Sequence, residues 1–209
     1  MRGQSPQIVA AGNADRVPEV AADLTEASFW NASQYRTAGS RILARFSIKD
    51  EFVAALVNQA NGRRVAEPTD LETRIDPLAE ASALALGHIK QGLEDGATVV
   101  AGGEQLHRDS GGWFVAPAVI GNVSPAMAVA REEIFGPSSR CRRSTPTRKH
   151  SAWPTTPIAG RRHVWSHDID RALTPARGLA AGTVAVNGPD AEHASLLPRP
   201  DRDSDVEGS

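Results

Sequence analysis

The stretch PLAEASALALGHIKQGLEDGATVVAGGE, residues 77–104, joins a helical pattern to a β-branched run and decides the fold class. An Asp-Pro pair suits the first turn of a helix, and a glycine follows where the apolar spacing ends. The aliphatic residues that share one side of this helix are Leu86, Ile89 and Leu93. The pattern therefore predicts a helix over 77–94 and, directly after it, a strand over 98–100 that ends at a glycine pair.

The same alternation continues on both sides of this stretch. Helical patterns run over 17–30, from Asp50 onward, and over 168–179. Short apolar runs over 113–120 and 182–186 predict two further strands. Helices interleaved with short apolar strands predict an α/β fold built on a sheet.

Length and composition limit the class of protein. A chain of 209 residues with 40% hydrophobic residues can bury the core of one globular domain, and its net charge of -2 excludes a mainly disordered acidic chain. No run approaches the ~20 apolar residues of a membrane helix, so we expect no membrane partner. The single cysteine excludes an internal disulfide, and the start MRGQSPQIVAAG lacks a secretory pattern, so we expect a cytoplasmic protein.

The charge is distributed unevenly along the chain. The segment 138–163 holds six arginines, one lysine and no acidic residue, a formal charge of +7, whereas the remaining 16 basic and 25 acidic residues give -9. This basic segment also has three prolines and few aliphatic side chains, so we expect it to be irregular. The last residues, 189–209, are rich in proline and charge and predict a loose tail.

Seven short phrases carry a resemblance to a known family. They are SPQIV (5–9), TAGSRIL (37–43), DEFVAALV (50–57), GATVVAGGE (96–104), GGWFVAPAVIGNV (111–123), AREEIFGP (130–137) and GTVAVNG (182–188). In this order they resemble the NAD(P)-dependent aldehyde dehydrogenase superfamily, and the match corresponds to the C-terminal, catalytic-domain portion of a typical member. The resemblance implies the three-layer sheet-and-helix catalytic domain of that fold, truncated and locally disrupted.

The resemblance also divides the chain. It implies a catalytic-domain portion over 1–137, the irregular basic segment over 138–163, the end of the catalytic domain over 164–188, and a degraded, disordered tail over 189–209.

The chemistry of the family requires a thiolate that attacks the aldehyde, NAD(P) that accepts a hydride, and a carboxylate that activates water. In the family the nucleophile ends a phrase resembling FWNxGQxC, but residues 29–36 read FWNASQYR, so Arg36 occupies its position. A guanidinium stays protonated and offers only hydrogen-bond donors, so it cannot form a thioester. The base belongs to a Glu-Leu-Gly-Gly phrase before SPQIV, where this chain has only MRGQ. The resemblance thus implies an enzyme-family chain that is inactive on its own.

Other candidate residues are fewer. Glu133 and Phe135 match the family pair that contacts the nicotinamide end of the cofactor, NAD or NADP, although the chain has no Gly-x-Gly-x-x-Gly phrase and binding by this chain is doubtful. Cys141 has arginine neighbours that would lower the pKa of its thiol, but we interpret it as an incidental surface thiol. No histidine or cysteine cluster has metal-ligand spacing, so we expect no metal site.

The genetic code offers an explanation of the basic segment. Residues 152–157, AWPTTP, require the codons GCN TGG CCN ACN ACN CCN, and the frame two bases later permits Leu-Ala-Asn-Asp-Thr, a family-like phrase. We therefore hypothesise a pair of compensating frameshifts between about Pro137 and Val164. The DNA sequence decides this, since a shifted frame without family-like sequence would exclude it.

Three functional interpretations remain open. The first is an inactive aldehyde dehydrogenase fragment, whose family substrates are aldehydes. The second is a non-catalytic partner of an intact homologue, in a homo- or hetero-oligomer. The third is nucleic-acid binding by the basic segment, which we do not expect because no recognised motif accompanies the charge.

Overall fold

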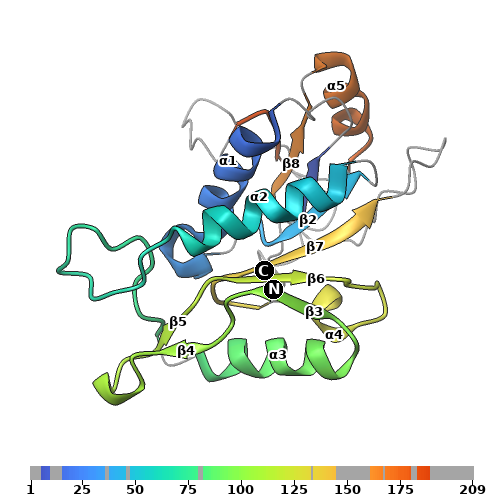
Figure 1. Ribbon diagram of the computed structural model, residues 1–209. Coiled ribbons are helices and arrows are strands. Elements are labelled where there is room, and N and C mark those ends of the chain that lie inside the picture. Colours follow the sequence, from blue (N-terminus) through green and yellow to red (C-terminus); the bar gives the residue numbers. More distant parts are fainter. Residues whose placement is uncertain are drawn as a thin grey trace, which may run out of the picture.

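The computed structural model describes residues 6–9, 16–35, 38–45, 48–79, 82–132, 134–144, 161–166, 168–179 and 183–188. Their main feature is a seven-stranded sheet of order β3-β6-β7-β2-β1-β8-β9 (Figure 1). All neighbouring strands in it are parallel except β3 and β6. The strands are β1 (Pro6–Val9), β2 (Arg41–Arg45), β3 (Thr98–Ala101), β6 (Ala118–Gly121), β7 (Ser138–Ser144), β8 (Arg161–Trp165) and β9 (Thr183–Val186). The fold class is thus α/β, as the alternating pattern predicts.

Two helices cover one face of the sheet, α1 (Val17–Phe29) and α2 (Lys49–Asn61). Both are amphipathic, and their apolar sides share one core with the strand residues that point toward them. The largest buried side chains of this core include Leu24, Phe29, Phe52 and Leu56 from the helices, and Ile42 and Trp165 from the strands. The predicted helices over 17–30 and from Asp50 are confirmed.

A third helix, α5 (Ile169–Gly178), covers part of the opposite face. Its Ala172 packs with Ile8, Leu43 and Val164, which lie on three adjacent strands. Asp168 begins the helix because its side-chain carboxylate accepts hydrogen bonds from the first free backbone amides. The sheet therefore has helices on both faces, which gives the three layers expected from the resemblance.

The region from α3 (Ser82–Glu94) to β6 forms the other end of the sheet. The described helix begins later than the predicted residue 77, because Leu78 instead forms an antiparallel bridge with Trp113. The run predicted as one strand over 113–120 is two strands, β5 (Phe114–Val115) and β6. β5 pairs with β4 (Gln105–Leu106) in a separate two-stranded sheet.

The expectation of an irregular segment over 138–163 is wrong for its two ends. Residues 138–144 form β7, which lies between β2 and β6, and 161–163 begin β8. A strand inside a sheet is held by the backbone hydrogen bonds of both neighbours, and these do not require an aliphatic side chain. The small side chains of Ser138 and Ser139 are buried there. The remaining residues of the segment, 145–160, lie outside the described residues, as does the tail over 189–209.

The described ranges contain neither a membrane-spanning helix nor a cluster of metal ligands. No helix there is long and apolar enough to cross a membrane. Among the same residues, no group of three or more histidine, cysteine, aspartate or glutamate side chains is arranged to hold a metal ion.

Candidate active site

Two chain segments enter the sheet side by side at one edge, namely those that precede β2 and β7. These strands are parallel, and Arg41 pairs with Arg140. Parallel neighbours begin at the same edge of a sheet, so residues 38–40 and 134–137 lie at a common edge. Of the predicted site residues on these two segments, Phe135 is described, whereas Arg36 and Glu133 lie outside the described residues.

The described part of this edge presents aromatic rings. Phe135 is 40% exposed, although its neighbour Ile134 is buried. Trp30, which directly follows α1, is 59% exposed and meets Tyr35 edge to face, with 5.4 Å between ring centroids. The Tyr35 hydroxyl donates to the carbonyl of Ala27, which ties this aromatic pair to α1. An exposed ring at this edge is suited to pack on a flat apolar ligand.

A buried glutamine holds the segment that precedes β2. Gln7 is fully buried on β1, and its Nε2 donates to the Gly39 carbonyl at 2.6 Å and to Ser28 Oγ at 3.2 Å. Ser28 Oγ donates to the same carbonyl at 2.8 Å, and the Gly39 amide donates to Ala27. The backbone at Gly39 is thereby fixed to both β1 and α1.

A buried arginine links the two segments. Arg140 is 2% exposed, and its Nη1 donates to the carbonyls of Val129 and Glu132, both at 2.9 Å. Its Nη2 donates to Ser40 Oγ, and its backbone amide donates to the Ser40 carbonyl at 2.8 Å. This one side chain therefore fixes the entry into β2 relative to the residues just before Glu133.

Sequence reasoning missed both Gln7 and Arg140. Their partners in these bonds lie up to 100 residues away along the chain. Such pairs depend on strand register, which no local pattern in one sequence reveals.

The structure corrects the view of Cys141 as a surface thiol with a lowered pKa. Cys141 lies on β7 within the core under α1 and α2 and is 1% exposed. Burial raises the pKa of its thiol from 9.0 to about 12, and the smaller opposing effect of Lys49 does not offset this. Because only the thiolate is a strong nucleophile, this residue cannot serve as one in the folded protein.

The comparisons with known proteins agree with this architecture. The model of the aldehyde dehydrogenase family matches residues 1–198. The solved aldehyde dehydrogenase KauB from Pseudomonas aeruginosa is 34% identical, with a TM-score of 0.83 over 90% of this chain and 38% of that one. An NAD+ complex of aldehyde dehydrogenase from Bacillus cereus is 30% identical, with a TM-score of 0.87 over 96% of this chain and 41% of that one.

A third relative, an NAD-dependent aldehyde dehydrogenase from Sinorhizobium meliloti, is 28% identical, with a TM-score of 0.85 over 96% of this chain and 40% of that one. The chain thus spans about two fifths of the length of these relatives. A family match over nearly the whole chain, on a parallel sheet of the same architecture, shows that this chain belongs to the aldehyde dehydrogenase family.

Proposed function

We propose that this chain is a catalytically inactive form of the catalytic portion of an aldehyde dehydrogenase. The observation that carries the proposal is the burial of Cys141, the single cysteine of the chain. Arg36 stands at the position where the resemblance places the nucleophile, and it cannot form a thioester. With its one thiol enclosed in the core, the chain has no group that starts covalent aldehyde oxidation.

Acylation by an activated ester tests this proposal without a cofactor. A reactive thiolate attacks the carbonyl of p-nitrophenyl acetate, a thioester forms, and p-nitrophenolate leaves with the bonding electron pair. We expect the unmodified chain to release no burst of p-nitrophenolate and to gain no acetyl group by intact-mass spectrometry. Stoichiometric acetylation of the folded, unmodified chain would refute the proposal.

Two variants make the result specific to the nucleophile position. Arg36→Cys places a thiol at this position, whereas Arg36→Ala removes the guanidinium without adding a thiol. We expect acetylation to appear in Arg36→Cys and to stay absent in Arg36→Ala. A parallel assay of aldehyde oxidation with NAD or NADP is expected to give no NADH or NADPH with the unmodified chain, and cofactor reduction above a no-protein control would contradict inactivity.

The cofactor belongs to the same proposal. When bound, NAD or NADP supplies the hydride acceptor. The exposed ring of Phe135 suits the apolar contact that the resemblance assigns to it, together with Glu133. This chain is not expected to retain the cofactor firmly, because one aromatic contact leaves the phosphates without a glycine-rich cradle. Fluorescence titration with NADH checks this, and saturable binding at micromolar NADH would contradict it.

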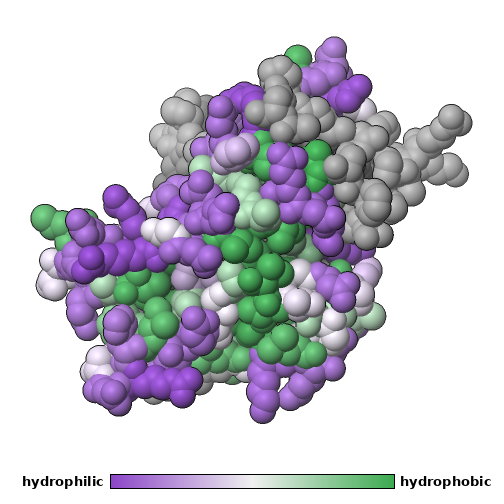
Figure 2. Space-filling view, viewed as in Figure 1, coloured by the Kyte–Doolittle hydropathy of each residue, from purple (hydrophilic) through white to green (hydrophobic). Residues whose placement is uncertain are grey.

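A non-catalytic role beside an intact homologue is the second proposal. It is supported by β3, an edge strand of the sheet on which Val100 is 43% exposed. Figure 2 shows apolar side chains gathered in a band across this view of the molecule, between α2 and α3. An open strand edge beside apolar surface is the kind of feature by which two chains pair. Light scattering after size exclusion, on the chain alone and mixed with the Bacillus cereus enzyme, tests this, and elution of only the separate species would exclude it.

A further inference from the structure

Four arginines project from the same face of the sheet, opposite α1 and α2. Arg41 on β2 pairs with Arg140 on β7 and with Pro6 on β1. Side chains alternate along a strand, so Arg142 lies on the same face as Arg140. Gln7 of β1 pairs with His163 of β8, which places Arg162 beside Pro6, again on this face. The alternate residues, among them Ile42 and Cys141, point to the core under α1 and α2.

Arg140 and Arg162 are buried, with 2% and 3% of their surface exposed. The Arg140 guanidinium donates to the Val129 and Glu132 carbonyls and to Ser40, as described above. Arg41 and Arg142, in contrast to Arg140 and Arg162, are only half-buried. The Nε of Arg41 is shielded from solvent and makes no hydrogen bond. Within the described ranges, no carboxylate forms an ion pair with Arg41 or Arg142.

Neighbouring positive charges on this face act on Arg41. Burial, and then repulsion by Arg162 and Arg142, lowers the pKa of the Arg41 guanidinium from 12.5 to about 10. The whole segment 138–163, which supplies Arg142 and Arg162, contains no aspartate or glutamate. Two half-buried cations that have no carboxylate partner among the described residues gain most from an anion that enters between them.

We propose that Arg41 and Arg142 form a binding site for a small tetrahedral oxyanion, of which inorganic phosphate is the simplest. They lie on adjacent strands at diagonal positions, since Leu43 pairs with Arg142 and lies two residues after Arg41. Each guanidinium presents a planar fork of N–H donors that matches two oxygens of a phosphate. Arg162 adds positive charge from the other side of Arg41. This site lies on a different face from Cys141 and needs no catalytic activity.

Binding of inorganic phosphate to the intact chain tests the proposal. Isothermal titration calorimetry at constant ionic strength, with chloride as the replaced anion, gives the affinity. We expect saturable binding by the unmodified chain, and at least tenfold weaker binding by Arg41→Gln and by Arg142→Gln. Arg142→Lys keeps the charge but loses the planar fork of donors, so its affinity for phosphate should lie between those of the unmodified chain and Arg142→Gln.

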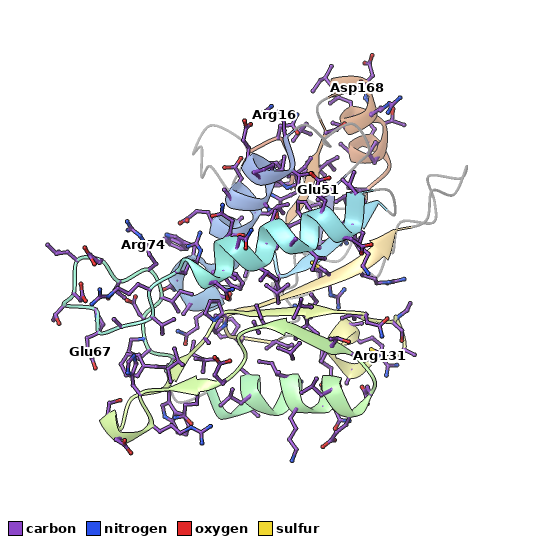
Figure 3. All side chains as sticks on the ribbon, in the orientation of Figure 1. Arg16, Glu51, Glu67, Arg74, Arg131 and Asp168 are labelled. Atoms are coloured by element: carbon purple, nitrogen blue, oxygen red, sulfur yellow. The ribbon has the colours of Figure 1, made fainter. Side chains whose placement is uncertain are left out.

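Arg74→Gln is the matched control because it removes the same charge from an exposed side chain on the loop after α2, far from β7 (Figure 3). Its affinity for phosphate is expected to stay within twofold of the unmodified chain. Absence of saturable phosphate binding by the unmodified chain overturns the proposal. An equal loss in Arg74→Gln also overturns it, because the binding then reflects overall charge.

Two measurements keep these outcomes decisive. Far-ultraviolet circular dichroism shows whether each variant is folded, and phosphate should raise the Tm of the unmodified chain but not that of Arg142→Gln. Competition with a single-stranded oligonucleotide separates a small oxyanion from a nucleic acid. If the oligonucleotide binds and free phosphate does not displace it, a nucleic-acid surface replaces the proposed site.

Discussion

The packing of Gly39 against Gln7 leads to a sharp prediction for Gly39→Ala. A Cβ added at Gly39 would overlap the Gln7 Nε2 atom and would lie 2.5 Å from its Cδ and 2.9 Å from its Cγ. Gln7 is fully buried, so its amide has no solvent to move into. The substitution therefore forces the amide away from the Gly39 carbonyl and from Ser28.

The size of the effect follows from these contacts. Overpacking of a filled site costs about 1–3 kcal/mol. Each hydrogen bond that Gln7 loses costs about 1 kcal/mol, and Gln7 makes two good ones, at 2.6 and 3.2 Å. We therefore expect Gly39→Ala to lower the free energy of unfolding by about 3–5 kcal/mol, a large part of the ~5–15 kcal/mol that holds a typical domain.

A double-mutant cycle with Gln7→Ala, followed by urea unfolding, checks this reasoning. With the glutamine truncated, the added methyl group meets open space, and Gly39→Ala should cost much less than in the unmodified background. Gly87→Ala is the control, because nothing lies within 4 Å of a Cβ there and the glycine is inside α3. It should raise stability by about 0.5–1 kcal/mol. Equal costs of Gly39→Ala in both backgrounds, within ~0.5 kcal/mol, would refute the packing explanation.

Three further predictions concern Cys141 and Asp168. Cys141 should resist a disulfide-exchange reagent such as DTNB until urea unfolds the chain, and prompt labelling of the folded chain would contradict its burial. Since burial raises the pKa of Cys141 from 9.0 to about 12, the unfolded chain loses this proton first, so stability should fall as pH rises above 9.0. Between pH 7 and pH 10 this effect lowers the free energy of unfolding by about 1 kcal/mol. The Cys141→Ala variant lacks the thiol and should not show this contribution. Asp168→Ala removes the cap of α5 and should cost about 1 kcal/mol, whereas Asp168→Asn should keep most of it; equal urea midpoints for the two variants would contradict the capping role.

The elements with strong local patterns were predictable from the sequence. The helix over 168–179 has both an N-cap and an amphipathic face, and the structure places it at Ile169–Gly178. The strand predicted over 182–186 is found at Thr183–Val186. Local propensity suffices for such segments because the residues that stabilise them are their own neighbours.

The centre of the sheet and the site were harder to predict. β7 reads SSRCRRS, which has no strand pattern, and its position depends on backbone pairing with β2 and β6. The links made by Arg140 and Gln7 depend on the same pairing. Arg36 and Glu133 were predicted from the resemblance, and both lie outside the described residues. The division of the chain at residues 138, 164 and 189 remains a prediction, apart from the strands found at 138–144 and 161–163. The frameshift hypothesis remains a prediction that the DNA sequence can decide.

The pairing of β2 with β7 also has a consequence for how the chain folds. Arg140 contacts Ser40 across 100 positions of sequence, and β1 pairs with β8 across a still longer interval. The middle of the sheet can therefore close only after long loops have lost much of their freedom. Proteins dominated by such distant contacts have a high contact order and fold slowly, so refolding should take milliseconds to seconds or longer. During that interval the edges of β1 and β2 remain open to other chains, which makes dilute conditions the better choice for refolding.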